Sequence, residues 1–245
     1  MEKSIFKKQI ILLLAILFIN SLFAQFADQD NSVQIKVWAE LDPVPGIFID
    51  DENTQQEINT VNNADTEFDK YFKYAINKVN NIAPFLVNGM LNGFTFDYVP
   101  SDKKRNVAEI WTFTENFDNL KEFNDFEYVQ NSIKDNTLEV WILAKRSESQ
   151  KMIYDSFKSV NNPKIKGEGS VSIEKGTEGI KEAVSLAARD AVRKYYTYQI
   201  REKPKEVTGK VIIVGEPRVY IKSGRYFVEL DFFLQTDKIT MYKFY

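Results

Sequence analysis

Two segments of the sequence place a glutamate two positions before a tryptophan, in Glu109-Ile110-Trp111 and Glu139-Val140-Trp141. Side chains two apart on a strand face the same side of a sheet. An acid beside an aromatic ring suits a sugar-cleaving site, because glycosidases place two carboxyl groups across a cleft. Large aromatic residues also fill the cores of sheets, and we favour that role for both tryptophans. Whether Trp111 and Trp141 are core or surface residues is left open by the sequence.

Two short motifs resemble parts of known catalytic or cofactor sites. Ser101-Asp102-Lys103-Lys104 has the serine–lysine spacing of penicillin-interacting enzymes, but the companion sequences S-D-N and K-T-G do not occur. These residue types are also common in turns, which is the interpretation we adopt. Gly167-Glu168-Gly169 begins like a dinucleotide-binding loop, yet Ser172 stands where the third glycine is required. The sequence therefore predicts no catalytic and no cofactor-binding residues.

Two acidic clusters could offer oxygen ligands to calcium, Asp28-Gln29-Asp30-Asn31 and Asp50-Asp51-Glu52. Neither follows the spacing of a calcium-binding loop. We interpret both as solvated loop residues and predict no metal site.

The residue types that are missing exclude several classes of enzyme. Among 245 residues there is no His and no Cys. The chain therefore has no imidazole base, no Ser-His-Asp or cysteine nucleophile, no His-ligated metal and no iron–sulfur cluster. It also has no cysteine to carry a lipid anchor. A non-catalytic protein is the favoured hypothesis.

The first 24 residues have the pattern of a signal peptide. Lys3, Lys7 and Lys8 precede an unbroken apolar run over residues 10–19, which is too short to span a membrane. The small residue Ala24 predicts cleavage before Gln25, with a shift to Ala27 as the alternative. The remaining chain would have 29 basic and 34 acidic residues, a net charge of −5. We expect a periplasmic or secreted protein that is not lipid-anchored and binds no nucleic acid.

The N-terminal half is predicted to consist of strands around one long helix. Apolar residues at helical spacing predict a helix over 68–86, with a kink or break before Pro84. A mixed segment over 117–130 suggests a short helix. Alternating residues predict the strands, which are 33–38, 94–98, 107–114 and 138–144.

The C-terminal half contains the clearest helix of the sequence. An alanine-rich stripe over residues 180–198 predicts a helix that packs closely on a sheet. Turns are expected at Gly215-Glu216-Pro217 and at Ser223-Gly224. Alternation predicts the strands, which are 207–214, 219–221, 226–234 and 239–245. If the last of these is an exposed terminal strand, it could pair with the sheet of a partner.

These elements predict an α+β fold, in which two long amphipathic helices pack on antiparallel sheets, with two helix-plus-hairpin subdomains as one arrangement. The expected organisation is a signal peptide at 1–24, an N-terminal subdomain at 25–146, a linker or boundary at 147–176 and a C-terminal subdomain at 177–245.

Our functional hypothesis is an exported, non-catalytic cell-envelope protein with a protein-binding or structural role. Its partner would be an envelope or appendage protein, or a second copy of the chain. The alternative is a carboxylate-dependent hydrolase of envelope or extracellular glycans, based on the Glu and Trp pairs. A weaker option is a small-ligand carrier, which requires a dry pocket of a few hundred Å³ between helix and sheet.

Overall fold

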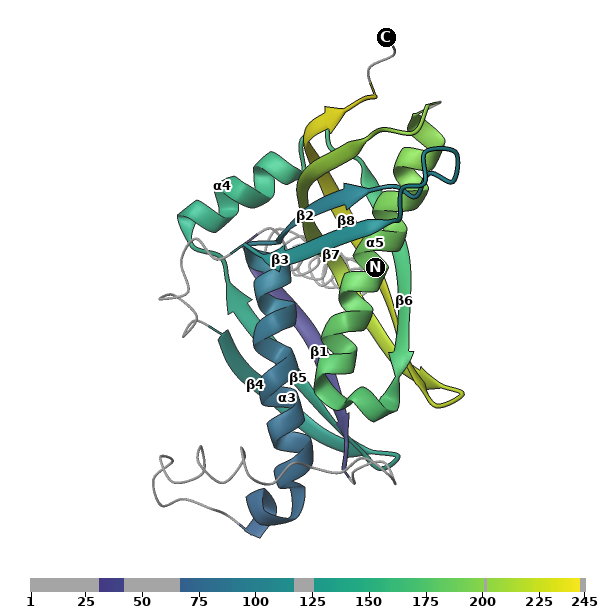
Figure 1. Cartoon of the computed structure of the whole chain (residues 1–245). Helices are drawn as coiled ribbons and strands as arrows, with labels where there is room; N and C mark the ends of the chain where they lie inside the picture. The colour runs from purple at the N-terminus through teal and green to yellow at the C-terminus, as the bar shows by residue number, and fades with distance from the viewer. Residues whose placement is uncertain (1–30, 42–66, 117–125, 201, 243–245) are drawn as a thin grey trace, which may run out of the picture.

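The computed structural model describes residues 31–41, 67–116, 126–200 and 202–242. It combines α-helices with antiparallel sheets, so the predicted α+β class is confirmed (Figure 1). In the described part of the chain the helices are α3 (Glu67–Leu91), α4 (Glu148–Phe157) and α5 (Gly176–Gln199), with a short 3-10 turn η2 (Ile173–Lys175). The strands are β1 (Ser32–Glu40), β2 (Phe94–Val99), β3 (Ile110–Glu115), β4 (Phe126–Lys134), β5 (Thr137–Lys145), β6 (Lys164–Ser172), β7 (Glu206–Lys222) and β8 (Arg225–Thr240).

The strands form two antiparallel sheets. One has the order β1-β5-β4 and the other the order β3-β2-β7-β8-β6. The second sheet joins the two halves of the sequence, because β2 pairs with β7 from Phe94↔Val211 to Tyr98↔Val207. The segment 147–176, in which we expected a linker or boundary, contains α4, β6 and η2, and β6 is paired with β8 along its whole length.

Helix α3 covers the inner face of the three-stranded sheet. Its buried stripe includes Ala75, Val79, Ile82 and Leu86, as the helical spacing predicts. The expected kink or break before Pro84 is wrong, because the helix continues to Leu91 and its non-helical residue is Phe72. Proline removes one helical hydrogen bond, and packing of the buried Ala83 and the partly buried Phe85 against the core offsets that loss.

Helix α5 packs on β6 at unusually short range. The alanine stripe of the helix faces two glycines of the strand, Gly167 and Gly169. A Cβ atom on Gly167 would lie 2.0 Å from the carbonyl oxygen of Ala187, and one on Gly169 would lie 2.1 Å from that of Ala183. Close packing of helix on strand therefore accounts for the Gly167-Glu168-Gly169 motif.

The hydrophobic core is shared by both sheets, α3 and α5. It contains residues of every strand from β1 to β8 except β3 and β4, whose Trp111, Phe113 and Phe126 pack against its rim. A smaller cluster lies under α4 on the other face of the five-stranded sheet, where Phe157 packs on Ile212 and Val214. The described residues contain no helix with the length and apolar character needed to cross a membrane.

Two sequence expectations about β-structure are tested by the pairing of β7 and β8. Residues 215–217 do not form the expected turn, because Val214 pairs with Asp231 and Arg218 already pairs with Glu229. The three residues form a bulge, which the left-handed φ of Gly215 (74°) and the missing N–H of Pro217 accommodate. The turn at Ser223-Gly224 is confirmed.

A separate terminal strand was expected over 239–245, of which residues 243–245 lie outside the described residues. Ile239 and Thr240 are the last residues of β8, and residues 241–242 are not in a strand. Most of β8 lies between β7 and β6, so it offers no free edge along that length. In the segment where a short helix was suggested, residues 126–130 belong to β4 and residues 117–125 lie outside the described part. Pairing with β5 takes precedence over the weak local preference of this segment.

Candidate functional site

The first acid and tryptophan pair is tied into the packing between β3 and α5. Trp111 is half-buried, and its indole Nε1 donates to Ser185 Oγ at 3.0 Å. Its ring stacks on that of Phe96, with centroids 5.4 Å apart. Glu109 accepts a hydrogen bond of 3.1 Å from the hydroxyl of Tyr98. Burial and the neighbouring Glu109 both raise the pKa of Tyr98. Trp111 and Glu109 therefore pack at the rim of the core and are held there by hydrogen bonds with Ser185 and Tyr98.

The second pair lies in the other sheet. Glu139 of β5 forms an ion pair of 3.3 Å with Lys36 of β1. Trp141 is half-buried and alternates with the buried Val140 and Ile142, so it lies on the face directed away from α3. The structure therefore does not bring the two pairs together in one sheet. Neither Glu109 nor Glu139 lines either of the two cavities described below.

The Ser101 to Lys104 motif lies in the turn between β2 and β3. Asp102 is buried and its Oδ1 accepts from the backbone N–H of Lys104 at 3.0 Å and of Arg105 at 3.3 Å. Its other oxygen is 2.5 Å from Arg105 Nη1. Hydrogen bonding from Arg105 is the main cause that lowers the pKa of Asp102. The motif builds a turn, as the residue types indicated.

The remaining sequence-predicted positions lie outside the described residues. These are the cleavage pair Ala24 and Gln25, the acidic cluster 50–52 and residues 28–30 of the other cluster, whose last residue, Asn31, is described. Within the described ranges, no group of three or more Asp or Glu side chains is arranged to hold a metal ion.

A polar cavity of about 560 Å³ lies beside this turn. Its lining carries the cations Lys103, Lys104, Arg105 and Lys203 and the acids Asp102 and Glu202. Arg105 stacks over the ring of Tyr242 at 4.2 Å, and Lys203 Nζ donates to the carbonyl of Ser101 at 2.8 Å. The lining therefore has more cations than acids, although Arg105 and Lys203 already have partners within it.

A buried ionic cluster connects three elements and was missed by the sequence reasoning. Lys78 of α3, whose side chain is 2% exposed, donates to the carboxylate of Glu40 on β1. It also donates to the hydroxyl of Tyr226 on β8 at 2.7 Å. Burial lowers the pKa of Lys78, while the charge and hydrogen bond of Glu40 oppose that change. Burial and the charge of Glu40 raise the pKa of Tyr226.

This cluster has groups that can exchange protons, but it lines neither of the two cavities. It acts as a cross-link between helix and sheets. The signal in the sequence was available, because Lys78 occupies a position of the buried helix stripe, three residues after Ala75 and four before Ile82.

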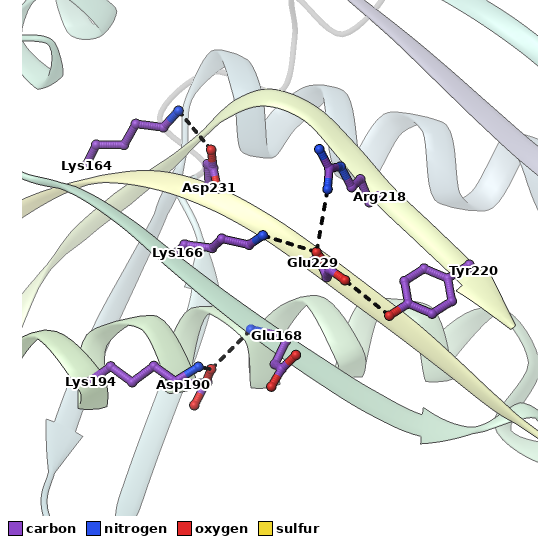
Figure 2. A network of polar contacts seen from close by, with 9 residues as sticks. All are labelled: Lys164, Lys166, Glu168, Asp190, Lys194, Arg218, Tyr220, Glu229 and Asp231. Atoms are coloured by element: carbon purple, nitrogen blue, oxygen red, sulfur yellow. Dashed lines mark hydrogen bonds and ion pairs between the residues drawn. The ribbon is translucent and has the colours of Figure 1, made fainter. Parts of the chain in front are cut away.

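The outer face of β6, β8 and β7 carries a paired set of charges (Figure 2). Glu229 accepts from Lys166 and from the hydroxyl of Tyr220, each at 3.2 Å. These two hydrogen bonds, from Lys166 first, lower the pKa of Glu229. Lys164 and Asp231 form a further ion pair of 2.8 Å on the same face. Charges that are matched in this way give the face little net attraction for a charged ligand.

The outer edge of β6 is occupied by α5. Asp190 of the helix accepts from the backbone N–H of Glu168 at 3.2 Å and pairs with Lys194 at 2.6 Å (Figure 2). Burial alone would raise the pKa of Asp190, but the hydrogen bonds from Lys194 and Glu168 outweigh burial and lower it. Asp190 therefore blocks strand addition at the middle of this edge.

The opposite edge of the same sheet, β3, is open in the described part of the chain. The hydrogen bond of 3.1 Å from Asn116 N to Gly93 O makes these two residues a hydrogen-bonded pair. Together with the register of β2 and β3, it shows which residues of β3 bond to β2. Since hydrogen-bonded pairs alternate along antiparallel strands, the N–H and C=O groups of Trp111, Phe113 and Glu115 point away from β2. Ile110 is 55% exposed at the start of this edge.

An apolar pocket of about 360 Å³ lies between α3 and the strands β4 and β5. Its position matches the requirement stated above for a small-ligand carrier. The edge of β3, this pocket and the polar cavity beside the β2–β3 turn are the candidate binding features that we consider.

Comparison with other proteins places the chain in a family but gives no functional description. A family model of uncharacterised proteins matches residues 21–242. A protein of Treponema pallidum (strain Nichols), named only as an uncharacterised protein, is 24% identical over 214 residues, which cover 87% of this chain and 83% of that relative. No solved structure matches the chain.

Proposed function

This chain belongs to that uncharacterised family, and from this premise we propose that it is an exported, non-catalytic cell-envelope protein that binds another protein through the edge of β3. Export is supported by the signal-like segment that precedes Gln25. A non-catalytic role is supported by the lack of His and Cys and by the two acid and tryptophan pairs, which serve as packing and ion-pair partners.

The open edge of β3 is the observation that carries the binding role. Its sequence Ile110-Trp111-Thr112-Phe113-Thr114-Glu115 consists mainly of β-branched and aromatic residues and includes no Pro or Lys. Its pairing with β2 contains no bulge. Proteins usually protect an edge with charges, prolines or bulges, because an exposed flat edge pairs with other chains. An unprotected edge suits strand addition by a partner.

The contrast with β6 strengthens this inference. Both strands are edges of the same sheet, yet at β6 the N–H of Glu168 is bonded to Asp190 and the helix α5 lies against the strand. One edge is blocked at Glu168 by α5, and the other is left with three outward-pointing backbone pairs. The partner would be an extended segment of another envelope protein, with apolar residues in alternate positions beside Trp111 and Phe113.

Site-specific photo-cross-linking in the native host tests the proposal. A photoreactive residue placed at Thr112 or Thr114, both exposed, should yield a cross-link to one envelope protein. The same residue placed at Glu168, on the closed edge, should not. N-terminal sequencing of the fractionated protein tests export separately, with Gln25 as the expected first residue.

A charge variant provides the second measurement. The double substitution Thr112→Lys and Thr114→Lys should reduce capture of that partner at least tenfold, since lysines on an edge oppose strand pairing. Glu168→Lys is the matched control, because it changes the net charge by the same amount on the closed edge. Equal capture by both variants would refute binding at β3, and cross-links solely between copies of the chain would replace a foreign partner with self-association.

A further inference from the structure

The apolar pocket lies where α3 stops covering the three-stranded sheet. The helix packs over β1 and β5, whereas β4 is the strand at the edge of the sheet next to β5 (Figure 1). The residues of β4 are mostly exposed. The apolar walls come from the helix on one side and the two strands on the other, and they are formed by Ile76, Val79, Val129, Leu138 and Val140. A volume of about 360 Å³ is within the range of small-molecule sites.

A bulge in β4 shapes the wall of this pocket. Tyr128 pairs with Ile142 and Gln130 already pairs with Trp141, so the register shifts between Tyr128 and Gln130. After the shift, Asn131 is opposite the buried Val140 and therefore lies on the face of the sheet that α3 covers. Bulges commonly redirect side chains beside functional sites. Here the bulge brings the amide of Asn131 to the pocket, on a face of the sheet where an apolar residue is usual.

The polar groups of the pocket are all uncharged. They are the side chains of Asn80, Tyr128, Gln130 and Asn131, and no charged residue is among the described residues that line it. The hydroxyl of Tyr128 donates to Asn80 Oδ1 at 2.8 Å, which joins the helix wall to the strand wall. Tyr128 is nevertheless 49% exposed. The amide groups can therefore meet the polar end of a ligand whose apolar part lies deeper.

We propose that the pocket between α3 and β4–β5 is a binding site for a small uncharged ligand with an apolar body and one hydrogen-bonding end. A charged ligand is disfavoured, because burying a charge without a counter-charge is costly. A partner strand is disfavoured as well, since the bulge interrupts the regular backbone edge of β4. This site is independent of the edge of β3, which belongs to the other sheet.

Calorimetric titration of the purified protein with octan-1-ol and with octanoate tests the proposal. The two probes share an alkyl chain and differ in charge. We expect saturable binding of one octan-1-ol per protein and at least tenfold weaker binding of octanoate. No saturable heat with octan-1-ol, or tighter binding of octanoate, would overturn the proposal.

A matched pair of variants locates the site. Asn131→Trp places a large ring on the pocket face of β4 and should abolish binding of octan-1-ol. Ser132→Trp places the same ring one residue later on the opposite face, where Ser132 pairs with Glu139, and should bind as the wild type does. If Asn131→Trp is unfolded by circular dichroism, Ile76→Trp fills the pocket from the helix side instead. Unchanged binding in a folded pocket-filling variant would show that the alcohol binds elsewhere.

Discussion

The ammonium of Lys78 lies 2.7 Å from the hydroxyl oxygen of Tyr226 and 4.6 Å from the centre of its ring. The two residues belong to α3 and β8, and Glu40 of β1 contacts the same ammonium. Three segments that are distant in the sequence, from both sheets and the helix between them, therefore meet at one buried charge. The cluster is thus one of the contacts that join the two sheets, together with the hydrogen bond from Trp38 Nε1 to Val219 O.

Lys78→Met should destabilise the protein by about 3–5 kcal/mol, because removal of one member of a buried ion pair leaves the other charge without a partner. The methionine can occupy the space of the lysine stem, so the loss reports on the charge rather than on a cavity. Urea unfolding at pH 7, followed by circular dichroism, measures the free energy of unfolding.

Two comparisons make this measurement specific. The double variant Lys78→Met with Glu40→Gln should recover part of the loss, since no unpaired charge then remains. Lys36→Met removes an ion pair to Glu139 in which the lysine is 34% exposed, and it should cost at most about 1 kcal/mol. A double variant whose loss equals the sum of the single losses would contradict the coupling.

Gly167→Ala should destabilise the protein by about 3 kcal/mol, the upper end for overpacking. The new Cβ would lie 2.0 Å from the carbonyl oxygen of Ala187 and 2.6 Å from the nitrogen of Ala191, so α5 must move away from β6. Gly215→Ala is the control: its Cβ meets no atom within 4 Å, although its φ of 74° is unfavourable for alanine. Thermal unfolding should show a clearly smaller effect for Gly215→Ala, and equal effects would refute the close contact.

These two sites indicate how far the sequence could lead. The alanine stripe of α5 predicted its close approach to a sheet, and apolar periodicity predicted the position of α3. Both predictions were possible because a helix that is buried on one face has apolar residues at regular spacing. The partner glycines of β6 were not recognisable, since their role depends on which strand lies beneath the helix. Lys78 could be recognised as a lysine on an apolar helix face. Its partners Glu40 and Tyr226 could not be predicted, because they are determined by tertiary packing.

The candidate sites depended still more on topology. No local pattern indicates that β3 is the edge of a sheet, because that follows from which strands pair with β2. The pocket beside β4 results from a bulge in that strand and from the fact that α3 covers β1 and β5 but not β4. Neither feature is encoded in a short motif. Gly215-Glu216-Pro217 has the composition of a turn, yet the long-range pairing of β7 with β8 makes it a bulge.

Asp190→Asn should destabilise the protein by about 1–2 kcal/mol at pH 7, since hydrogen bonds to a charged group are stronger than those to a neutral one. The pKa of Asp190 is lowered from its ordinary value of 3.8. The charged form therefore stabilises the fold above about pH 4, and this contribution is lost as the pH falls through the lowered pKa. The difference in unfolding free energy between wild type and variant should shrink toward pH 2, and a constant difference would contradict this assignment.

Tyr196→Phe should make the protein less sensitive to alkali. Burial raises the pKa of Tyr196 from 10.0 to about 12, although the hydrogen bond of 2.6 Å that it shares with Thr236 opposes this. The folded state holds the neutral phenol, so its contribution is fully present below pH 10 and is lost as the pH rises toward 12. A difference of two pKa units corresponds to about 2–3 kcal/mol.

Urea unfolding at pH 8, 10 and 11.5 distinguishes this effect from the loss of a hydrogen bond. At pH 8 the Tyr196→Phe variant should be about 1 kcal/mol less stable than the wild type, because the bond to Thr236 is missing. At pH 11.5 that deficit should disappear or reverse, since the variant lacks the phenol of Tyr196, which in the wild type ionises on unfolding. Tyr198, which is 90% exposed two residues later, provides the control, and Tyr198→Phe should follow the wild type at every pH. Parallel curves for Tyr196→Phe and the wild type would show that the phenol of Tyr196 does not contribute to the alkaline loss of stability.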